Sequence, residues 1–529
     1  MRNHQFPGRS VVMSTDAMAA TSQPMATQAA LQILRDGGNA LDAAIAASAT
    51  LAVVESYSTG IGGDCFILYH EASSGKLHAL NGSGRSAAAA TIEAMQSRGH
   101  ETMPEQGILA VTVPGAVDAW HCAHNRLGSL SFKDLLQPAI HYAEQGYAVS
   151  PIIAHNWKSC ETLLSQTPEA AAAYLIDGKA PQAGMIHRQP DLAKSLRLIA
   201  DQGRDAFYQG AIAEEIIRFS DSHNGLLSLD DLASHQSEWV DPISSDYRGY
   251  RVCEIPPNSQ GITTLMALNI LAQTEVSQFE HLSAGHIHLL SQAFSLAMAE
   301  RDRFISDPEF NQLPVDELLS TEFAKTQFAR IKMDQVLAQP VSSILPNHKN
   351  TVYLSVVDKS RNACSLINSV FYSWGSGLVA GSTGINLQNR GSGFTLEPGH
   401  FNQLEPRKRP MHTIIPAMVY QGEKPVLCFG VMAGQYQAMG QTYVLSNWID
   451  YGMDIQQSLD AARFLLYDGE LSVEAAISAE TRNTLSGLGH QVAVADSPLG
   501  GGQAIYIDWE NGVLHGGSDP RKDGMAAGF

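Results

Sequence analysis

Apolar residues recur at helical spacing through the first part of the chain. Between residues 24 and 35 they fall every three or four positions, which places them on one face of a helix. Gly37-Gly38 is a typical helix end, and Asn39 or Asp42 is a typical start for the next helix. The run 43–54 is alanine-rich and too short to cross a bilayer, so it predicts a buried helix. The same spacing predicts further helices over 116–124, 132–144, 212–218, 285–303 and 455–462.

Strand patterns dominate the last part of the chain. Residues 351–358 and 363–371 flank a short polar turn, which is typical of a β-hairpin. Two more hairpins are predicted, one over 413–432 and one that begins at 503 and turns at 510–512. Because strand pairs and long helices both occur, the chain is predicted to form an α+β fold in which two sheets are covered by helices.

Charge and composition limit the possible partners. The 529 residues are 44% hydrophobic and 16% charged, which is ordinary for a globular protein. The formal net charge is −19, and this argues against nucleic acid or an anionic membrane as a partner, since both require a basic face.

Other sequence features narrow the location and the chemistry. The first nine residues lack the apolar core of a signal peptide, so we expect a cytoplasmic protein. The six cysteines lie far apart without a CxxC pair, which predicts buried free thiols, although one could serve as a nucleophile. The glycine-rich segment 60–64 lacks the Gly-Lys-Ser/Thr of a phosphate loop and predicts a tight turn. We expect no metal and no cofactor, because the sequence contains no HExxH motif and no other ligand set.

Thr351 begins the first predicted strand of the last part of the chain. A threonine hydroxyl is a poor nucleophile unless a base lies within hydrogen-bond reach. The α-amine of an N-terminal threonine can be that base, because its unperturbed pKa is about 7.7–8. Thr351 would gain such an amine only if the bond from Asn350 were cut. The alternative interpretation is that Thr351 is an ordinary β-branched strand residue.

Several motifs, in order along the chain, make the sequence similar to the γ-glutamyltranspeptidases over nearly its whole length. Each motif is weak alone, but their number and order carry the resemblance. They occupy residues 37–44, 60–64, 113–116, 256–261, 302–304, 350–358, 380–387, 408–410 and 518–521.

This resemblance implies the four-layer αββα fold of N-terminal nucleophile hydrolases and a cut between Asn350 and Thr351. Residues 1–350 would become a large subunit and 351–529 a small one, interleaved in one structural unit as a heterodimer. Thr351 would then attack an amide carbonyl, and water or an amine acceptor would resolve the acyl-enzyme.

The resemblance also assigns the groups that assist Thr351. The backbone N–H groups of Ala433 and Gly434 would hold the oxyanion, and Ala433 replaces a family glycine. We expect that replacement to be harmless if the φ angle of Ala433 is negative. Ser369 would orient the nucleophile, although a plain strand serine is the alternative.

Arg390 marks a departure from the family pattern. The family's ammonium-binding acid and glutamine align with Gly393 and Arg390, so the pocket is predicted to suit an anion, with Arg390 as its carboxylate ligand. His412 and Thr413 align with two serines that bind the substrate carboxylate in relatives.

Arg85 is the nearest match to the family's remaining carboxylate ligand, although Ser83 can be aligned there instead. Structural roles remain the alternatives for Arg390 and His412. The span 394–408 is short, which predicts an open cleft without a lid.

Three functions remain open at this point. The family default is cleavage of γ-glutamyl amides such as glutathione. The departures around Arg390 favour an acylase for dicarboxylate-type amides, glutaryl or oxamate-like, similar to cephalosporin acylases. An unprocessed, non-catalytic scaffold is the third possibility. In each enzymatic case the partners are a small-molecule amide and water or an amine.

Overall fold

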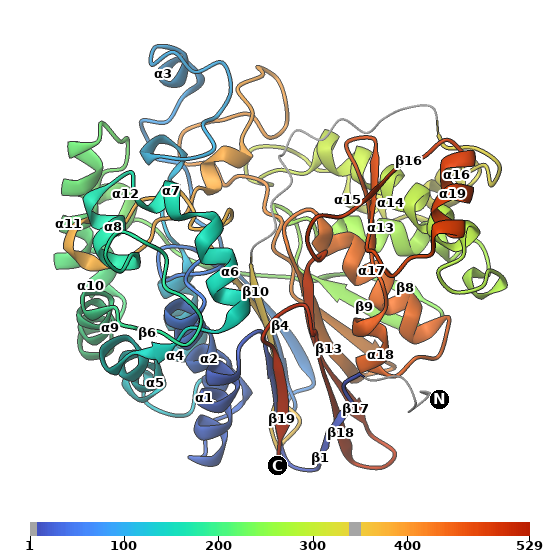
Figure 1. Ribbon diagram of the computed structural model, residues 1–529, viewed down its shortest axis with the longest axis horizontal. Coiled ribbons are helices and arrows are strands. Elements are labelled where there is room, and N and C mark those ends of the chain that lie inside the picture. The colour runs from blue at the N-terminus through green and yellow to red at the C-terminus, as the bar shows by residue number, and fades with distance from the viewer. Residues whose placement is uncertain (1–7, 338–350) are drawn as a thin grey trace.

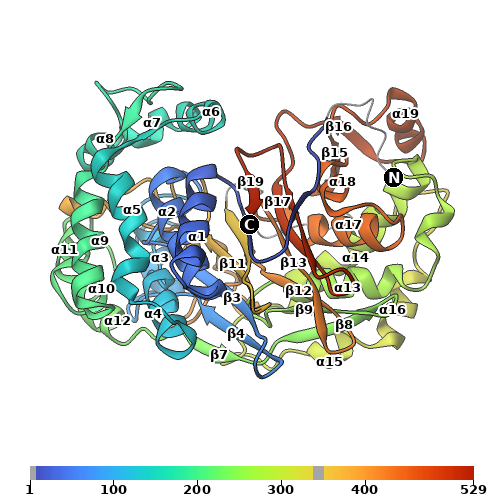
Figure 2. The same cartoon turned by 90° about the horizontal axis from the view of Figure 1, so that it is seen from below.

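The computed structural model describes residues 8–337 and 351–529. Two seven-stranded sheets face each other at the centre, and helices cover the outer face of each sheet (Figures 1 and 2). The molecule therefore has the predicted α+β architecture, with four layers in the order helices, sheet, sheet, helices.

The first sheet, which we call the nucleophile sheet, contains the strand that follows Thr351. Neighbouring strands in it run antiparallel. Its order is β19 (Met525–Gly528), β2 (Met18–Thr21), β10 (Val352–Val357), β11 (Ala363–Ser369), β3 (Asp64–Glu71), β4 (Lys76–Gly82) and β7 (Glu238–Val240).

The second sheet, called the facing sheet, is also antiparallel. Apolar side chains of both sheets, including Phe66, Tyr353, Met418 and Ile505, form the core between them. Its order is β1 (Val12–Ser14), β18 (Val513–Ser518), β17 (Gly501–Asp508), β13 (Lys424–Met432), β12 (Ala417–Gln421), β9 (Tyr250–Glu254) and β8 (Ile243–Tyr247).

Different helices cover the two sheets. The nucleophile sheet carries α1 (Pro24–Arg35), α2 (Ala40–Val54), α4 (Ala116–Leu127) and, outside α2, α5 (Phe132–Gln145). The facing sheet carries α13 (Gly261–Leu271), α17 (Tyr436–Ile449), α18 (Ile455–Asp460) and, outside α13, α14 (Ala284–Phe304).

The remaining longer elements are α6 (Pro151–Ser159), α8 (Pro168–Tyr174), α9 (Pro190–Gln202), α11 (Ala211–Ser222), α16 (Thr321–Phe328), α19 (Ala479–Gly487), β14 (Phe464–Tyr467), β15 (Glu470–Val473) and β16 (Gln491–Val494). The shortest are α3 (Ile92–Gln96), α7 (Glu161–Leu164), α10 (Asp205–Tyr208), α12 (Leu229–Ala233), α15 (Val315–Leu318), β5 (Tyr147–Ala148) and β6 (Ile186–His187).

Most predicted elements form, and two strand boundaries move for identifiable reasons. Asn39 caps α2 through a capping box with Asp42, as the sequence indicated. Strand β12 begins at 417 rather than 413, because the backbone before it bonds side chains: the carbonyl of Thr413 accepts from Gln260 (2.7 Å) and the N–H of Ile415 donates to Gln437 (3.1 Å). Strand β11 ends at Ser369, because Phe371 has a φ of +81° and cannot continue it.

The segments on either side of the expected cut are interleaved. In the nucleophile sheet, β10 pairs with β2 and β11 pairs with β3. In the facing sheet, β12 pairs with β9 and β18 pairs with β1. Each sheet therefore contains strands from both 8–337 and 351–529. No helix within these two ranges is both long and apolar enough to cross a membrane.

Glu254, at the end of β9, gives a prediction about stability. Its carboxyl group is fully buried, and neither oxygen has a hydrogen-bond partner within the described part of the chain. Burial raises the pKa of this carboxyl well above its usual value. The unfolded chain loses this proton at a pKa of about 4.3, whereas the folded protein keeps it to a higher pH. The stability that is fully present below about pH 4.3 is therefore lost as the pH rises toward the folded-state pKa.

We therefore expect Glu254→Gln to stabilise the protein relative to wild type by a margin that grows by about 1.4 kcal/mol for each pH unit above about 5. Urea denaturation at pH 5.5 and 7.5 measures this margin, with Thr351→Ala added to both proteins so that each remains one chain and unfolds at equilibrium. An unchanged margin at the two pH values would contradict a neutral, buried Glu254.

Candidate active site

Thr351 lies directly before β10 and is fully buried. Its hydroxyl oxygen is 3.2 Å from the hydroxyl of Ser369 and 3.5 Å from the side-chain nitrogen of Gln437. The hydroxyl of Ser369 in turn accepts a hydrogen bond from the backbone N–H of Phe371 (2.9 Å). The threonine oxygen is thus held by groups from β11 and α17. Asn350 lies outside the described residues.

The turn between β13 and α17 brings Ala433 and Gly434 to the end of the facing sheet. Their φ angles are +84° and +47°. The condition that we set for a harmless alanine, a negative φ, is therefore not met. The reason is the sharp turn, in which the carbonyls of both residues accept the first N–H groups of α17. No described residue accepts a hydrogen bond from the N–H of either residue, so both donors are available to a ligand.

Alanine in this conformation is strained, because its Cβ crowds the backbone. We expect Ala433→Gly to raise the free energy of unfolding by about 1 kcal/mol and to leave turnover within about twofold, since glycine keeps the backbone donor. Urea denaturation in the uncut Thr351→Ala background tests the stability, and steady-state kinetics of the cut enzyme test the turnover. The matched control is Ala200→Gly in α9, where the same change is expected to lower stability by about 1 kcal/mol.

Arg390 is fully buried in a short helical turn, Arg390–Gly393. One terminal nitrogen donates to the hydroxyl of Thr413 (3.2 Å), and the guanidinium lies over the ring of Phe371, 4.1 Å from its centroid. Nε and Nη2 have no hydrogen-bond partner among the described residues. Burial lowers the pKa of Arg390 to about 10, against the opposing charge of Asp64, so it is a cation at neutral pH. A buried cation with two unused donors favours an anionic ligand.

His412 does not have a nitrogen free for a substrate. Its Nε2 is 2.7 Å from a carboxylate oxygen of Asp64, to which it can donate, and its Nδ1 is 3.2 Å from the amide nitrogen of Asn258, from which it can accept. Both positions are therefore used within the protein, and we withdraw His412 as a direct carboxylate ligand. Burial and the charge of Arg390 hold the pKa of His412 below its usual value, despite the opposite effect of Asp64.

Asp64 is a central residue of the site that the sequence did not single out. Its carboxylate accepts hydrogen bonds from the N–H groups of Gly84 and Gly115 (both 3.0 Å) and from the side chain of Gln388 (2.9 Å). Burial acts to raise its pKa, but the hydrogen bond and charge of His412 keep it below the usual value. Its only sequence signal was an acid at the end of the glycine-rich turn 60–64.

Gln260 also joins parts of the site without having been predicted. Its amide nitrogen donates to the carbonyls of Thr413 (2.7 Å) and Gly434 (3.0 Å). Its oxygen accepts from the buried Arg301 (2.7 Å). Gln260 therefore fixes the Thr413 strand relative to the Ala433–Gly434 turn.

Arg85 lies in a different environment from Arg390. Its guanidinium contacts the carboxylates of Glu309 (2.6 Å), Glu238 (3.2 Å) and Asp307 (3.4 Å). These anions neutralise it, so we leave Arg85 out of the anion site. Ser83, the alternative match to the family's carboxylate ligand, donates its hydroxyl to the side-chain oxygen of Asn81 (2.6 Å).

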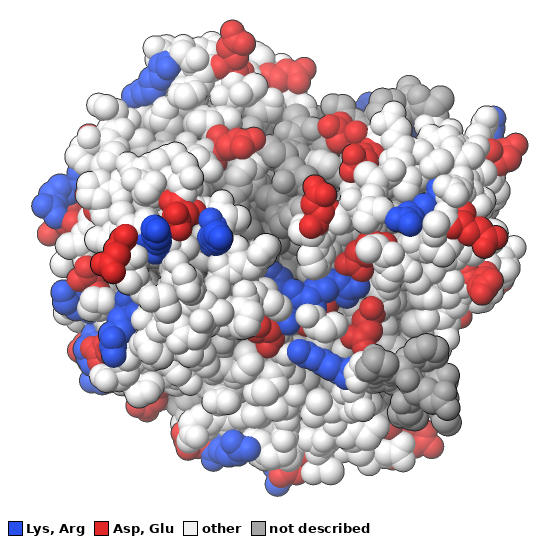
Figure 3. Space-filling view, in the orientation of Figure 1, with Lys and Arg blue, Asp and Glu red and all other residues white. Residues whose placement is uncertain are grey.

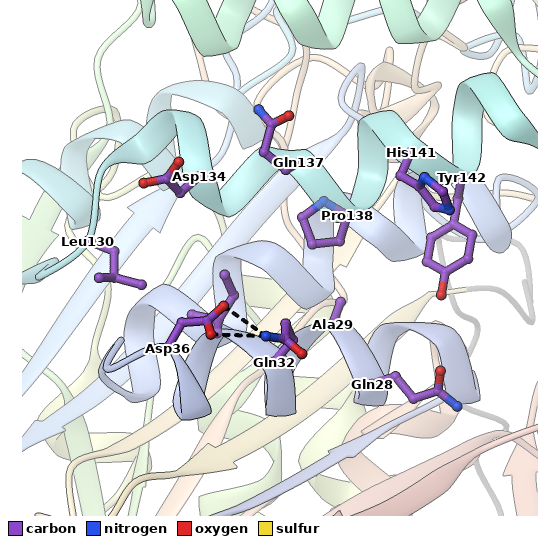
Figure 4. A pocket seen from close by; sticks show the side chains of 11 residues that line it. Gln28, Ala29, Gln32, Asp36, Leu130, Asp134, Gln137, Pro138, His141 and Tyr142 are labelled. Carbon is purple, nitrogen blue, oxygen red and sulfur yellow. Dashed lines mark hydrogen bonds between the residues drawn. The ribbon is translucent and has the colours of Figure 1, made fainter.

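A separate pocket lies between α1 and α5, on the outer helical layer (Figure 4). It has a volume of about 670 Å³ and is lined by residues such as Gln32, Asp36, Pro138 and His141. None of the residues discussed above lines it. Thr351 and Arg390, rather than this pocket, therefore define the candidate active site. Among the described residues, no group of three or more His, Cys, Asp or Glu side chains is arranged to hold a metal.

Comparison with known proteins agrees with this geometry. The model of the gamma-glutamyltranspeptidase family matches residues 26–529. The glutathione hydrolase-like YwrD proenzyme of Bacillus subtilis is 41% identical, over 98% of this chain and 99% of its own length. The oxamate amidohydrolase proenzyme of Klebsiella pneumoniae is 33% identical, over 98% and 99%. The crystal structure of a cephalosporin acylase from Bacillus halodurans aligns with a TM-score of 0.93 at 40% identity, covering 100% of this chain and 99% of that one.

Two facing sheets with helices outside them, and a buried threonine at the start of a central strand, define an N-terminal nucleophile hydrolase fold. Within that class, the chain belongs to the gamma-glutamyltranspeptidase family. It is therefore an enzyme of a hydrolase and transferase family, and the fold and family expected from the sequence are confirmed. The relatives differ in their named substrates.

Proposed function

We propose that the chain is an autoprocessing amidohydrolase that removes acyl groups ending in a carboxylate. The observation that carries this proposal is the buried guanidinium of Arg390, whose Nε and Nη2 have no partner among the described residues. The guanidinium of Arg390 stacks on the ring of Phe371. The backbone N–H of Phe371 donates to the hydroxyl of Ser369, which is hydrogen-bonded to the hydroxyl of Thr351. A carboxylate on Arg390 would therefore lie near the nucleophile.

Maturation and turnover would use the same hydroxyl. Thr351 Oγ1 would attack the carbonyl carbon of Asn350, and the C–N bond would break as the ester forms, with the proton passing to the nitrogen, so that this shift frees the α-amine of Thr351. Water would then hydrolyse the ester, releasing the carboxylate of Asn350 and regenerating the threonine hydroxyl. In turnover, this amine would take the hydroxyl proton as Oγ1 attacks the substrate amide. The N–H groups of Ala433 and Gly434 would stabilise the oxyanion. The tetrahedral intermediate would then collapse, with the α-ammonium of Thr351 returning its proton to the substrate nitrogen, and the amine half of the substrate would leave. Water would hydrolyse the acyl-threonine ester, or an acceptor amine would take the acyl group.

A second candidate is cleavage of γ-glutamyl amides, which the name of the 41%-identical relative favours. A γ-glutamyl group carries an ammonium beside its carboxylate, and that ammonium needs an acceptor. Asp64 is a buried carboxylate whose charge acts on Arg390, and it already accepts hydrogen bonds from Gly84, Gly115, Gln388 and His412. This arrangement favours an acyl group without the ammonium.

Turnover of glutaryl-p-nitroanilide and γ-glutamyl-p-nitroanilide by the purified protein tests the choice. We expect a higher kcat/KM for the glutaryl compound. Equal or faster turnover of the γ-glutamyl compound would overturn the anion-pocket proposal and favour the second candidate.

A further inference from the structure

Arg301 is a buried cation close to the candidate active site, near the end of α14. Figure 3 shows charged side chains of both signs at the surface, whereas Arg301 is fully buried. One of its terminal nitrogens, Nη1, donates to the side-chain oxygen of Gln260 (2.7 Å) and to that of Gln435. Its Nε donates to a carboxylate oxygen of Asp302 (2.8 Å), which balances its charge. Arg301 therefore joins two glutamines from different parts of the chain.

Both glutamines stand at the start of a helix. Gln260 is the N-cap of α13 and Gln435 is the N-cap of α17, and neither side chain bonds the N–H groups of its own helix. Each side-chain oxygen accepts from Arg301 instead. A cation near a helix N-terminus is unfavourable. Stabilisation of the two helices therefore does not explain Arg301.

The two glutamines act on the same peptide group, the one that joins Gly434 to Gln435. The amide nitrogen of Gln260 donates to the carbonyl of Gly434 (3.0 Å), and Gln435 supplies the other half of this peptide group. Because Arg301 binds both side chains, it restricts the backbone torsions on the C-terminal side of the Gly434 N–H. A donor to an oxyanion is effective only when it is aimed at the developing charge.

Arg301 also determines which way the amide of Gln260 faces. A guanidinium can only donate hydrogen bonds, so it holds the oxygen of this amide and turns the nitrogen away. That nitrogen donates to the carbonyl of Thr413 (2.7 Å) as well as to that of Gly434. The hydroxyl of Thr413 accepts from Arg390 (3.2 Å). The separation of the anion site from the oxyanion turn is thus set by one oriented amide.

We propose that Arg301 is a positioning residue, which aims the N–H groups of Ala433 and Gly434 at the oxyanion through Gln260 and Gln435. This proposal rests on the proposed function, in which those N–H groups stabilise the oxyanion. Arg301 itself does not touch the substrate. Its loss is expected to lower kcat more than it raises KM, because interactions made only in the transition state are weakened.

Two inhibitors that differ only at the reacting end test the proposal. The ligand 4-boronobutanoate has the chain length of a glutaryl group, with boron in place of the carbonyl carbon. Boron accepts a lone pair from Thr351 Oγ1 while the α-amine takes the hydroxyl proton, so a B–O bond forms, no group leaves, and the tetrahedral boronate carries an oxygen at the oxyanion position. Butanoate has the same carboxylate and chain without boron. Inhibition constants and steady-state kinetics are measured for both.

Arg301→Lys keeps a positive charge beside Asp302, but an ammonium lacks the fork that reaches two amide oxygens and a carboxylate. We expect it to weaken the boronate about 30-fold and butanoate less than about threefold, and to lower kcat about 30-fold, since loss of an oxyanion donor costs about 10²–10³-fold and a misaimed donor costs less. Gln260→Met leaves the pair of Arg301 and Asp302 intact and is expected to act in the same direction. If Arg301→Lys does not fold or is not cut, Gln260→Met decides alone.

The matched control is Arg204→Lys, which alters an arginine paired with the buried Asp118 among the helices outside the nucleophile sheet. It is expected to lower stability and to keep the ratio of the two inhibition constants, a ratio that does not depend on how much of the enzyme folds. An unchanged ratio in Gln260→Met would overturn the proposal. So would equal weakening of both inhibitors, because Arg301 would then only hold the fold together.

A second pair of inhibitors separates this proposal from the choice of acyl group. The ligands 2-amino-4-boronobutanoate and 2-aminobutanoate add the ammonium of a γ-glutamyl group. If wild type prefers this pair, the proposed acyl specificity fails, and the test of Arg301 proceeds with the preferred pair. A wild type that binds neither boronate more tightly than its boron-free counterpart would show that the turn stabilises no oxyanion, and would overturn the role of Arg301 as well.

Discussion

A Thr351→Ala variant is expected to remain a single chain and to lose amidase activity by about four orders of magnitude or more. One hydroxyl is needed both to cut the bond from Asn350 and to attack the substrate. The neighbouring hydroxyl of Ser369 does not replace it, because Ser369 gains no α-amine from the cut. Denaturing gels and mass spectrometry test the first effect. Wild type is expected to give fragments of roughly 38 and 19 kDa, from chain length alone. Turnover of glutaryl-p-nitroanilide tests the second effect.

Two variants serve as controls for this result. Thr351→Ser keeps a hydroxyl and is expected to be cut, more slowly than wild type. Ser369→Ala removes the neighbour 3.2 Å away and is expected to slow both reactions by about 10- to 100-fold without abolishing them. Two fragments from Thr351→Ala, or full activity in an uncut chain, would contradict the assignment of Thr351.

Arg390→Gln is expected to reduce kcat/KM for glutaryl-p-nitroanilide by about 10²- to 10³-fold. The variant would leave a substrate carboxylate buried without its charged partner, which costs about 2–5 kcal/mol. It also removes the stacking on Phe371. Steady-state kinetics are measured with the glutaryl compound and with butyryl-p-nitroanilide, which lacks the carboxylate. The glutaryl compound reports the loss of carboxylate binding, and the butyryl compound reports any loss in the chemical step.

The neutral substrate is the control for structural damage, and its turnover is expected to change by less than about threefold. Arg390→Lys is expected to have an intermediate effect, because an ammonium keeps the charge but not the two-pronged geometry. Equal losses for both substrates would show that Arg390 supports the pocket and does not bind the acyl carboxylate.

The strands and helices that position Thr351 could be predicted because their signals are local. The hairpin 351–371 contains β-branched residues around a polar turn, and it forms as β10 and β11. The helix 24–35 forms with the expected bounds, because its apolar face and proline start need no distant partner to be recognised.

The chemistry around Arg390 could be predicted only in part. Its residue type indicated an anion site, but its stacking on Phe371 depends on the positive φ of Phe371, which the sequence does not predict. The pair Asp64 and His412 is separated by more than 300 residues, so neither residue predicts the other. Ala433 adopts a positive φ because the turn into α17 requires it, although alanine usually has a negative φ.

Both sheets combine strands from 8–337 with strands from 351–529, and this has a consequence for how the protein folds and unfolds. Neither piece contains a complete sheet, because β2 lies between β19 and β10 in the nucleophile sheet, and β1 and β9 flank the four strands of 351–529 in the facing sheet. The fold must therefore be complete before any scission. Once the connection is gone, a denatured molecule becomes two chains that must find each other again, so its survival would depend on the rate of unfolding rather than on an equilibrium.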